Sequence, residues 1–122
     1  MHEASHEYSV SDAGGGNRVS DEQLDEIVRR LVKALSPVCV VFFGSHAYGH
    51  PRPDSDVDIM IVVSDDAPNR YELSRRAYAA LGDIDVPVEL HFSRAAQFER
   101  FSTVVGSLQR EVKRRGRVLY AA

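Results

Sequence analysis

The stretch FFGSHAYGHPRPDSDVDIMIVV, residues 42–63, decides how this chain folds. It closes one apolar run at Phe43, turns at Gly44-Ser45, and opens a second apolar run in which Asp56 and Asp58 stand near the start. Side chains alternate between the two faces of a strand, so the two aspartates should point the same way. Adjacent carboxylates cost stability unless a cation or a hydrogen-bond donor lies between them. The stretch therefore predicts two strands joined by a turn, with a charged feature that needs a neutralising partner.

The bulk composition is that of one soluble globular domain. The chain has 122 residues, of which 43% are apolar and 27% charged, and its net charge of −3 gives no basic field for binding nucleic acid. Cys39 is the single cysteine, so no disulfide can form within the chain, which suits a reducing compartment. The sequence shows neither an apolar signal core nor a run of membrane-spanning length. These features predict a cytoplasmic protein that is not bound to a membrane.

The first half of the chain predicts a tail, a helix and a strand. Residues 1–18 are polar without apolar periodicity, so we expect a disordered N-terminal tail, followed by one folded domain over residues 19–122. Ser20 and Gln23 form a capping box that starts a helix, which Pro37 ends. The run from Val38 to Phe43 predicts a strand covered on both faces. The helix has a single apolar stripe, formed by Leu24, Ile27, Val28, Leu31, Val32 and Leu35.

The second half alternates strands with helices, which predicts an α/β or α+β domain. After the strand from Asp56 to Val63, we expect a helix capped by Asp65 or Asp66 and running to about Leu81. A strand over Val86–Phe92 should carry Glu89 and His91 on one face, opposite its apolar residues. The remaining predicted elements are a short helix capped by Ser93, a last helix carrying Val104, Val105, Leu108 and Val112, and a short final strand over Arg117–Tyr120.

The residues of the central stretch have the chemistry of a triphosphate and metal site. Gly44 lacks a side chain, so backbone N–H groups at the turn can approach an anion, and Ser45 adds a hydroxyl donor. Asp56 and Asp58 offer the hard oxygen ligands that Mg²⁺ prefers, and Glu89 supplies a third carboxylate. Three carboxylates can hold two divalent ions about 3.5–4 Å apart, of which one activates an attacking hydroxyl and the other neutralises a leaving pyrophosphate. Metal between the carboxylates would make their proximity tolerable.

Other interpretations of these residues are weaker. A calcium-binding loop would need glycine where the chain has Ile59. His46 and His50 have the spacing of zinc ligands on a helix, but Gly49 makes a regular helix there doubtful. His91 shares a face with Glu89, where it would act as a base or simply fill the sheet face, and the sequence leaves both roles open.

The ordered set Gly44-Ser45, Gly49 and Ser55-Asp56-x-Asp58, followed by an apolar strand, resembles the nucleotidyltransferase superfamily that includes DNA polymerase β. It is most similar to the small bacterial minimal nucleotidyltransferase (MNT) domains. The resemblance continues through the strand around Glu89 to the C-terminal segment, so that it covers about residues 24–120.

This resemblance implies a small mixed sheet flanked by helices and a Mg²⁺-dependent transfer of a nucleoside monophosphate, AMP from ATP, to a hydroxyl acceptor. By position, Gly44, Ser45 and Ser55 would bind the nucleotide. Asp56, Asp58 and Glu89 would be the catalytic and metal-binding carboxylates, holding two Mg²⁺ ions.

The resemblance also bears on partners. Some MNT proteins belong to toxin–antitoxin pairs and attach AMP to a HEPN-type toxin, which implies a protein partner or a homo-oligomer for this chain. The third carboxylate of the family is commonly Asp and is Glu89 here, so an antitoxin-like module that neutralises a partner by contact, with a degenerate site, is the alternative. A sugar-nucleotide transferase, whose Asp-x-Asp also holds metal, fits less well because the chain is short and has the Gly44-Ser45 element.

Overall fold

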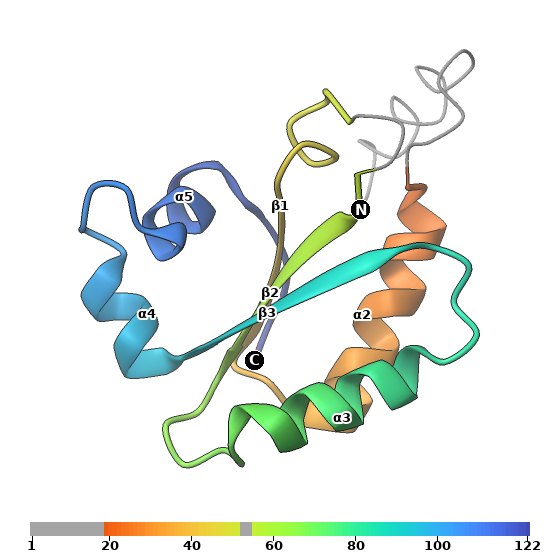
Figure 1. Cartoon of the computed structure of the whole chain (residues 1–122), viewed down its shortest axis with the longest axis horizontal. Coiled ribbons are helices and arrows are strands. Elements are labelled where there is room, and N and C mark those ends of the chain that lie inside the picture. The colour runs from red at the N-terminus through yellow and green to blue at the C-terminus, as the bar shows by residue number, and fades with distance from the viewer. Residues whose placement is uncertain (1–18, 52–54) are drawn as a thin grey trace.

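The computed structural model describes residues 19–51 and 55–122, and the predicted tail over residues 1–18 lies outside this part. Helices and strands alternate along the chain as expected for an α/β protein (Figure 1). In chain order the elements are α2 (Asp21–Leu35), β1 (Cys39–Phe43), β2 (Val57–Val63), α3 (Arg70–Leu81), β3 (Val88–Arg94), α4 (Ala95–Phe101), α5 (Leu108–Arg115) and β4 (Arg117–Ala121).

The strands form one mixed sheet in the order β3-β2-β1-β4. β1 is antiparallel to both β2 and β4, whereas β2 and β3 are parallel. The register pairs Phe43 with Asp58 across β1 and β2, and Asp58 with Glu89 across β2 and β3. The ends of three chain segments therefore meet at one place on the sheet.

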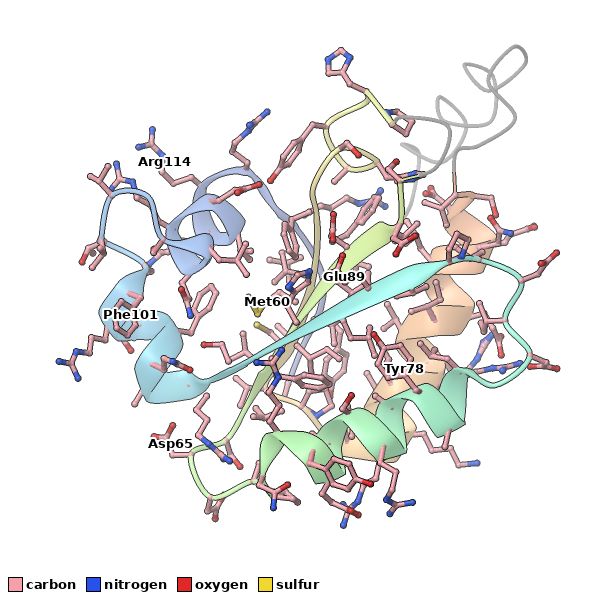
Figure 2. All side chains as sticks on the ribbon, viewed as in Figure 1. Met60, Asp65, Tyr78, Glu89, Phe101 and Arg114 are labelled. Carbon is pink, nitrogen blue, oxygen red and sulfur yellow. The ribbon has the colours of Figure 1, made fainter. Side chains whose placement is uncertain are left out.

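Helices cover both faces of this sheet. α2 and α3 lie on one side and the shorter α4 and α5 on the other (Figure 1). The larger core, on the α2–α3 side, includes Ile27, Phe42 and Ile59, whereas Met60 belongs to the smaller core on the α4–α5 side (Figure 2). Alternation along β2 thus places Asp58 on the same face as Met60, which is the face that the short helices cover.

α2 confirms the prediction made from its N-terminal sequence. The Ser20 hydroxyl accepts a hydrogen bond from the Gln23 backbone N–H at 3.0 Å, and the Gln23 side chain accepts one from the Ser20 N–H at 2.8 Å. This reciprocal capping box satisfies two backbone donors that the first turn would otherwise leave unpaired. The helix ends at Leu35, just before Pro37, as predicted.

Two helix caps differ from those predicted. α3 is capped by Asn69, whose side chain accepts from the Glu72 N–H at 2.9 Å, so neither Asp65 nor Asp66 caps it. Instead, Asp65 accepts a hydrogen bond from the Ala96 N–H at 3.0 Å. Ser93 does not cap α4 because it is a β3 residue with only 2% of its surface exposed.

Some element boundaries are also shifted. β3 begins at Val88 rather than Val86 and continues to Arg94, which pairs with Val63. β2 begins at Val57, one residue later than predicted. The last helix begins only at Leu108, so the predicted helical residues Val104 and Val105 lie before it and are exposed. The predicted final strand is confirmed as β4.

None of the helices in the described ranges is both long enough and apolar enough to span a membrane.

Candidate functional site

Three potential metal ligands from two neighbouring strands converge on one face of the sheet. One ligand atom from each of Asp58, Glu89 and His91 lies within 4.8 Å of the other two. His91 Nε2 is 3.2 Å from Asp58 Oδ1 and 4.0 Å from Glu89 Oε2. The parallel register of β2 and β3 explains this convergence, because it sets Asp58 beside Glu89 and places His91 next on the same face.

The Gly44 turn closes directly onto this group. Gly44 has a φ of +85°, and a Cβ added there would lie 2.3 Å from Asp58 Oδ2. The antiparallel pair of Phe43 and Asp58 brings the next residue, Gly44, against the carboxylate. Glycine meets both demands at this position, since it accepts a positive φ and leaves room for the aspartate.

The turn after Gly44 is held by backbone hydrogen bonds rather than by a regular helix. The Tyr48 N–H donates to the Gly44 carbonyl at 3.0 Å, and the His50 N–H donates to the Ser45 carbonyl at 2.9 Å. Residues 45–49 form hydrogen-bonded turns, so a helix N-terminus does not add its dipole to the site. This agrees with the expectation that Gly49 disfavours a helical zinc pair at His46 and His50.

His46 connects the turn to the segment that leads into β2. It is 5% exposed, and its Nε2 lies 3.0 Å from the Ser55 carbonyl oxygen and 3.1 Å from the Ser55 hydroxyl. The Ser45 hydroxyl donates to the Ser55 hydroxyl at 3.5 Å. The predicted nucleotide-binding residues Gly44, Ser45 and Ser55 therefore lie together, one segment against the other. The sequence did not indicate this contact of His46.

The predicted carboxylates differ in how closely they approach the group. The Asp58 side chain is 25% exposed and that of Glu89 is 58% exposed, so the site is open to solvent from the Glu89 side. Glu89 is labelled on β3 in Figure 2. Asp56 lies just before β2, is exposed, and is not a member of the group formed by Asp58, Glu89 and His91. Within the described residues, the structure thus brings two of the three predicted carboxylates together and adds His91.

The donor set fits a divalent cation. Two carboxylates and an imidazole offer hard oxygen atoms and one borderline nitrogen within reach of a single ion. A Cβ added at Gly44 would lie 2.3 Å from Asp58 Oδ2, so a side chain at this position would intrude on the carboxylate.

A second polar network lies on the other side of the turn. The Tyr48 hydroxyl donates to Glu111 Oε2 at 3.0 Å, and the Arg115 guanidinium carbon is 3.8 Å from the Tyr48 ring centroid. Burial raises the pKa of the Tyr48 phenol, and its hydrogen bond to Glu111 acts in the same direction. The network ties the turn to α5.

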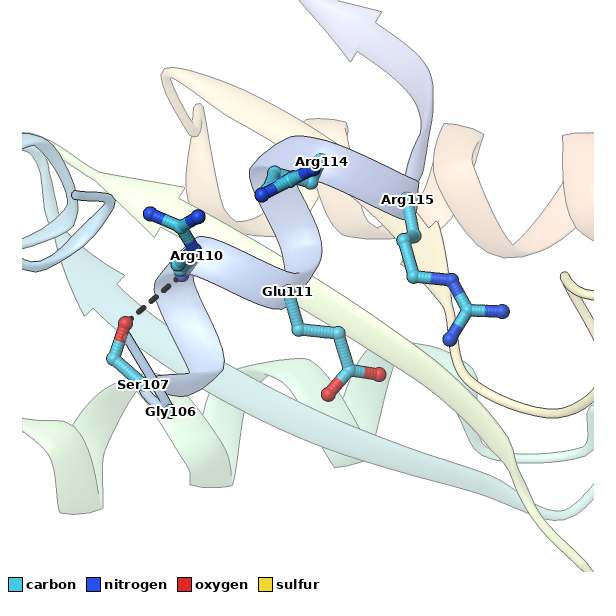
Figure 3. Close-up of a pocket in the computed structure, with 6 residues that line it drawn as sticks. All are labelled: Gly106, Ser107, Arg110, Glu111, Arg114 and Arg115. Carbon is cyan, nitrogen blue, oxygen red and sulfur yellow. Dashed lines mark hydrogen bonds between the residues drawn. The ribbon is translucent and has the colours of Figure 1, made fainter. Parts of the chain in front are cut away.

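This network borders a basic hollow of about 420 Å³ along α5. Figure 3 shows its three arginines, Arg110, Arg114 and Arg115, and its one carboxylate, Glu111, projecting from α5 in different directions. Gly106 and Ser107 complete the lining. The hollow shares no lining residue with the carboxylate group on the sheet, and two of its lining residues, Glu111 and Arg115, contact Tyr48 of the turn.

Comparison with known proteins agrees with the fold. The model of the nucleotidyltransferase domain family matches residues 22–119. A Sulfolobus solfataricus protein assigned to the nucleotidyltransferases has a similar structure, with a TM-score of 0.57, 19% identity, and coverage of 82% of this chain and 78% of that one.

Two toxin–antitoxin structures also share the fold. One, crystallised with AMP-PNP, has a TM-score of 0.50 and 22% identity over 80% of this chain and 73% of that one. The other, a mutant of the MntA–HpeT pair, has a TM-score of 0.51 and 22% identity over 85% and 75% of the two chains. The curated proteins include no match to the sequence. Because the family model spans most of the chain, and the fold agrees with it, this protein belongs to the nucleotidyltransferase domain family.

Proposed function

We propose that this protein is a Mg²⁺-dependent nucleotidyltransferase that moves AMP from ATP to a hydroxyl group of a protein partner. The observation that carries the proposal is the contact between the Gly44 turn and the carboxylate group. A Cβ at Gly44 would collide with Asp58 Oδ2, so an anion held by the turn would lie next to the metal ligands. Phosphate and divalent metal need this proximity in nucleotidyl transfer.

The residues have separate tasks in this proposal. Gly44, Ser45 and Ser55 bind the phosphates of the nucleotide, while Asp56, Asp58 and Glu89 hold Mg²⁺. The bound metal supplies charge neutralisation on the triphosphate and favours deprotonation of the acceptor hydroxyl. Glu89 is the more exposed of the two converging carboxylates, so it lies on the side from which an acceptor can enter.

The reaction is a substitution at phosphorus. The acceptor oxygen bonds to the α-phosphorus as the bond between that phosphorus and the bridging oxygen of the β-phosphate breaks. Pyrophosphate leaves with the bonding electrons, and the acceptor proton passes to the Glu89 carboxylate. The turn fixes the phosphates while the protein partner presents its hydroxyl, so positioning provides much of the rate enhancement.

The toxin–antitoxin neighbours support a protein acceptor. Two of the solved structures with this fold are toxin–antitoxin assemblies, and one was determined with AMP-PNP. We propose by analogy that the partner is a HEPN-type protein and that it completes the acceptor site.

The test is transfer of radiolabel from α-³²P-ATP in the presence of Mg²⁺ and a candidate HEPN-type partner. Wild-type protein should label the partner, and Asp58→Asn should reduce labelling by at least about 10²-fold because a metal ligand is lost. The matched control is Asp25→Asn, which removes an exposed carboxylate from α2 on the other face of the sheet. Equal labelling by wild type and Asp58→Asn would refute the proposal.

A binding experiment distinguishes this enzyme from the alternative, an antitoxin-like module that neutralises its partner by contact alone. Calorimetry with Mg²⁺-ATP should show binding to wild type and loss of binding in Asp56→Asn, which keeps the side-chain volume. A wild-type protein that binds the partner tightly but binds no nucleotide would support the degenerate module instead.

A further inference from the structure

His91 occupies a position that the proposed transfer reaction does not use. Its side chain is 23% exposed, so it is sheltered by the sheet face yet open to an ion from solvent. Its Nε2 is directed at both carboxylates of the group, 3.2 Å from Asp58 Oδ1 and 4.0 Å from Glu89 Oε2. The contact with Asp58 is within hydrogen-bond distance, so Asp58 holds the imidazole with Nε2 facing the two carboxylates, where this nitrogen could also bind an ion.

These separations suit ligands of a single ion. Consider two ligand atoms that each lie about 2.1 Å from a cation. They are about 3.0 Å apart when they occupy adjacent positions at a right angle, and about 4.2 Å apart when they lie on opposite sides of the cation. The two distances from His91 Nε2 fall within this span. His91 thus stands near the spacing that coordination requires from each carboxylate, and the two carboxylates lie within 4.8 Å of each other.

The imidazole is held in place by packing. Phe43 lies at the end of β1 with 4% of its surface exposed, and its ring meets the His91 ring in an edge-to-face arrangement, with centroids 5.1 Å apart and planes at 61°. A ring supported in this way loses little further freedom on binding a metal, so its contribution to affinity is large.

The chemistry of the set determines which metal it prefers. Mg²⁺ favours oxygen ligands alone and gives up water reluctantly. Mn²⁺ shares the preference for carboxylate oxygen but is a first-row transition metal, so it accepts one nitrogen ligand beside the two carboxylates more readily than Mg²⁺ does. We propose that His91 is a ligand of the metal site, together with Asp58 and Glu89, and that this site binds Mn²⁺ more tightly than Mg²⁺. The inference rests on the proposed function for its setting, and it concerns the preference of this site between Mn²⁺ and Mg²⁺.

The test uses Mn²⁺ alone, without nucleotide, on the full chain. Electron paramagnetic resonance of bound Mn²⁺ should show coupling to a ¹⁴N nucleus, and competition should show Mn²⁺ binding at least tenfold more tightly than Mg²⁺. His91→Gln should abolish the nitrogen coupling and weaken Mn²⁺ by about tenfold or more, with Mg²⁺ affinity nearly unchanged. His50→Gln removes an exposed imidazole elsewhere and should change neither property.

Each contrary outcome has a defined meaning. Mn²⁺ that binds without nitrogen coupling, coupling that persists in His91→Gln, or no divalent ion bound at all would overturn the assignment of His91. Transfer of AMP that depends on Asp58 but shows no nitrogen coupling would leave the proposed function standing without His91. Nitrogen coupling in a protein that transfers no nucleotide would remove the proposed function and keep the metal site.

Discussion

At the scale of single residues, Gly44 is a point at which the backbone closely approaches Asp58 of the carboxylate group. It combines a positive φ with the absence of space for a side chain, and these two constraints are separable. Gly106 has nearly the same φ, +89°, but a Cβ added there would meet nothing within 4 Å. Alanine substitution at each of these two glycines therefore distinguishes the effect of backbone strain from the effect of a side chain that intrudes into the site.

We predict that Gly44→Ala loses divalent-metal binding, whereas Gly106→Ala retains it. Both variants should lose about 1–3 kcal/mol in free energy of unfolding, because alanine is strained at a positive φ. Only the Gly44 variant also displaces Asp58, so only this variant should show no heat of binding when it is titrated with Mn²⁺. Urea denaturation and calorimetry with Mn²⁺ measure the two effects. Retained metal affinity in Gly44→Ala would show that the turn and Asp58 are not coupled.

At the scale of elements, α3 carries an exposed charge cluster near its N-terminus. Hydrogen bonds from Arg75 and Arg76, at 2.7 Å each, lower the pKa of Glu72 to about 2 from its ordinary value of 4.5. A carboxylate whose pKa is depressed in the folded state contributes stability above its unfolded pKa and loses it as the pH falls. The contribution should thus be complete above pH 4.5 and mostly gone near pH 2.

We predict that Glu72→Gln lowers the thermal unfolding temperature at pH 6 and that the difference from wild type narrows as the pH falls from 4.5 toward 2. The group is exposed, so salt should weaken the effect. Thermal melts by circular dichroism at several pH values measure it, with Asp25→Asn on α2 as the control. A difference that stays constant across this pH range would assign the effect to helix propensity rather than to charge.

The elements also show which signals in the sequence are sufficient. Ser20 and Gln23 located the start of α2 because a capping box is complete within four residues. The predictions that Asp65 or Asp66 caps α3 and that Ser93 caps α4 were wrong for a reason that lies outside the local sequence. Ser93 pairs with Val62 in the parallel ladder and is buried by it, and Asp65 is used by the first turn of α4.

The site was predictable to a similar extent. Alternation along β3 correctly placed Glu89 and His91 on one face. That Asp58 is shared between Gly44 and His91 depends on the registers of two strand pairs, which no local pattern gives. Asp56 lies outside the group because it precedes β2, which starts only at Val57, so the alternation of the strand does not fix the direction of its side chain.

At the scale of the whole molecule, the first described helix and the last strand are joined by a sheltered ion pair. Arg117 of β4 approaches Asp21 of α2 with Nη1 3.7 Å from Oδ1, and the Asp21 side chain is only 8% exposed. Neither carboxylate oxygen of Asp21 has a hydrogen-bond partner among the described residues, so its charge depends on the arginine and on the N-terminus of α2. A carboxylate buried in this way is costly once its partner is removed.

A double-mutant cycle tests this connection between the two ends of the domain. Arg117 has a further interaction besides the ion pair, so the stability lost in Arg117→Gln alone overestimates the contribution of the ion pair. The cycle with Asp21→Asn isolates the coupling free energy between the two side chains. We predict a coupling free energy of about 0.5–3 kcal/mol from urea denaturation, with the double variant more stable than the sum of the single losses implies. β4 pairs with β1, whose end carries the Gly44 turn, so release of β4 should also lower metal affinity. Additive losses in stability would mean that Asp21 is stabilised by its own helix, and that β4 is held in the domain by its pairing with β1 and by apolar packing.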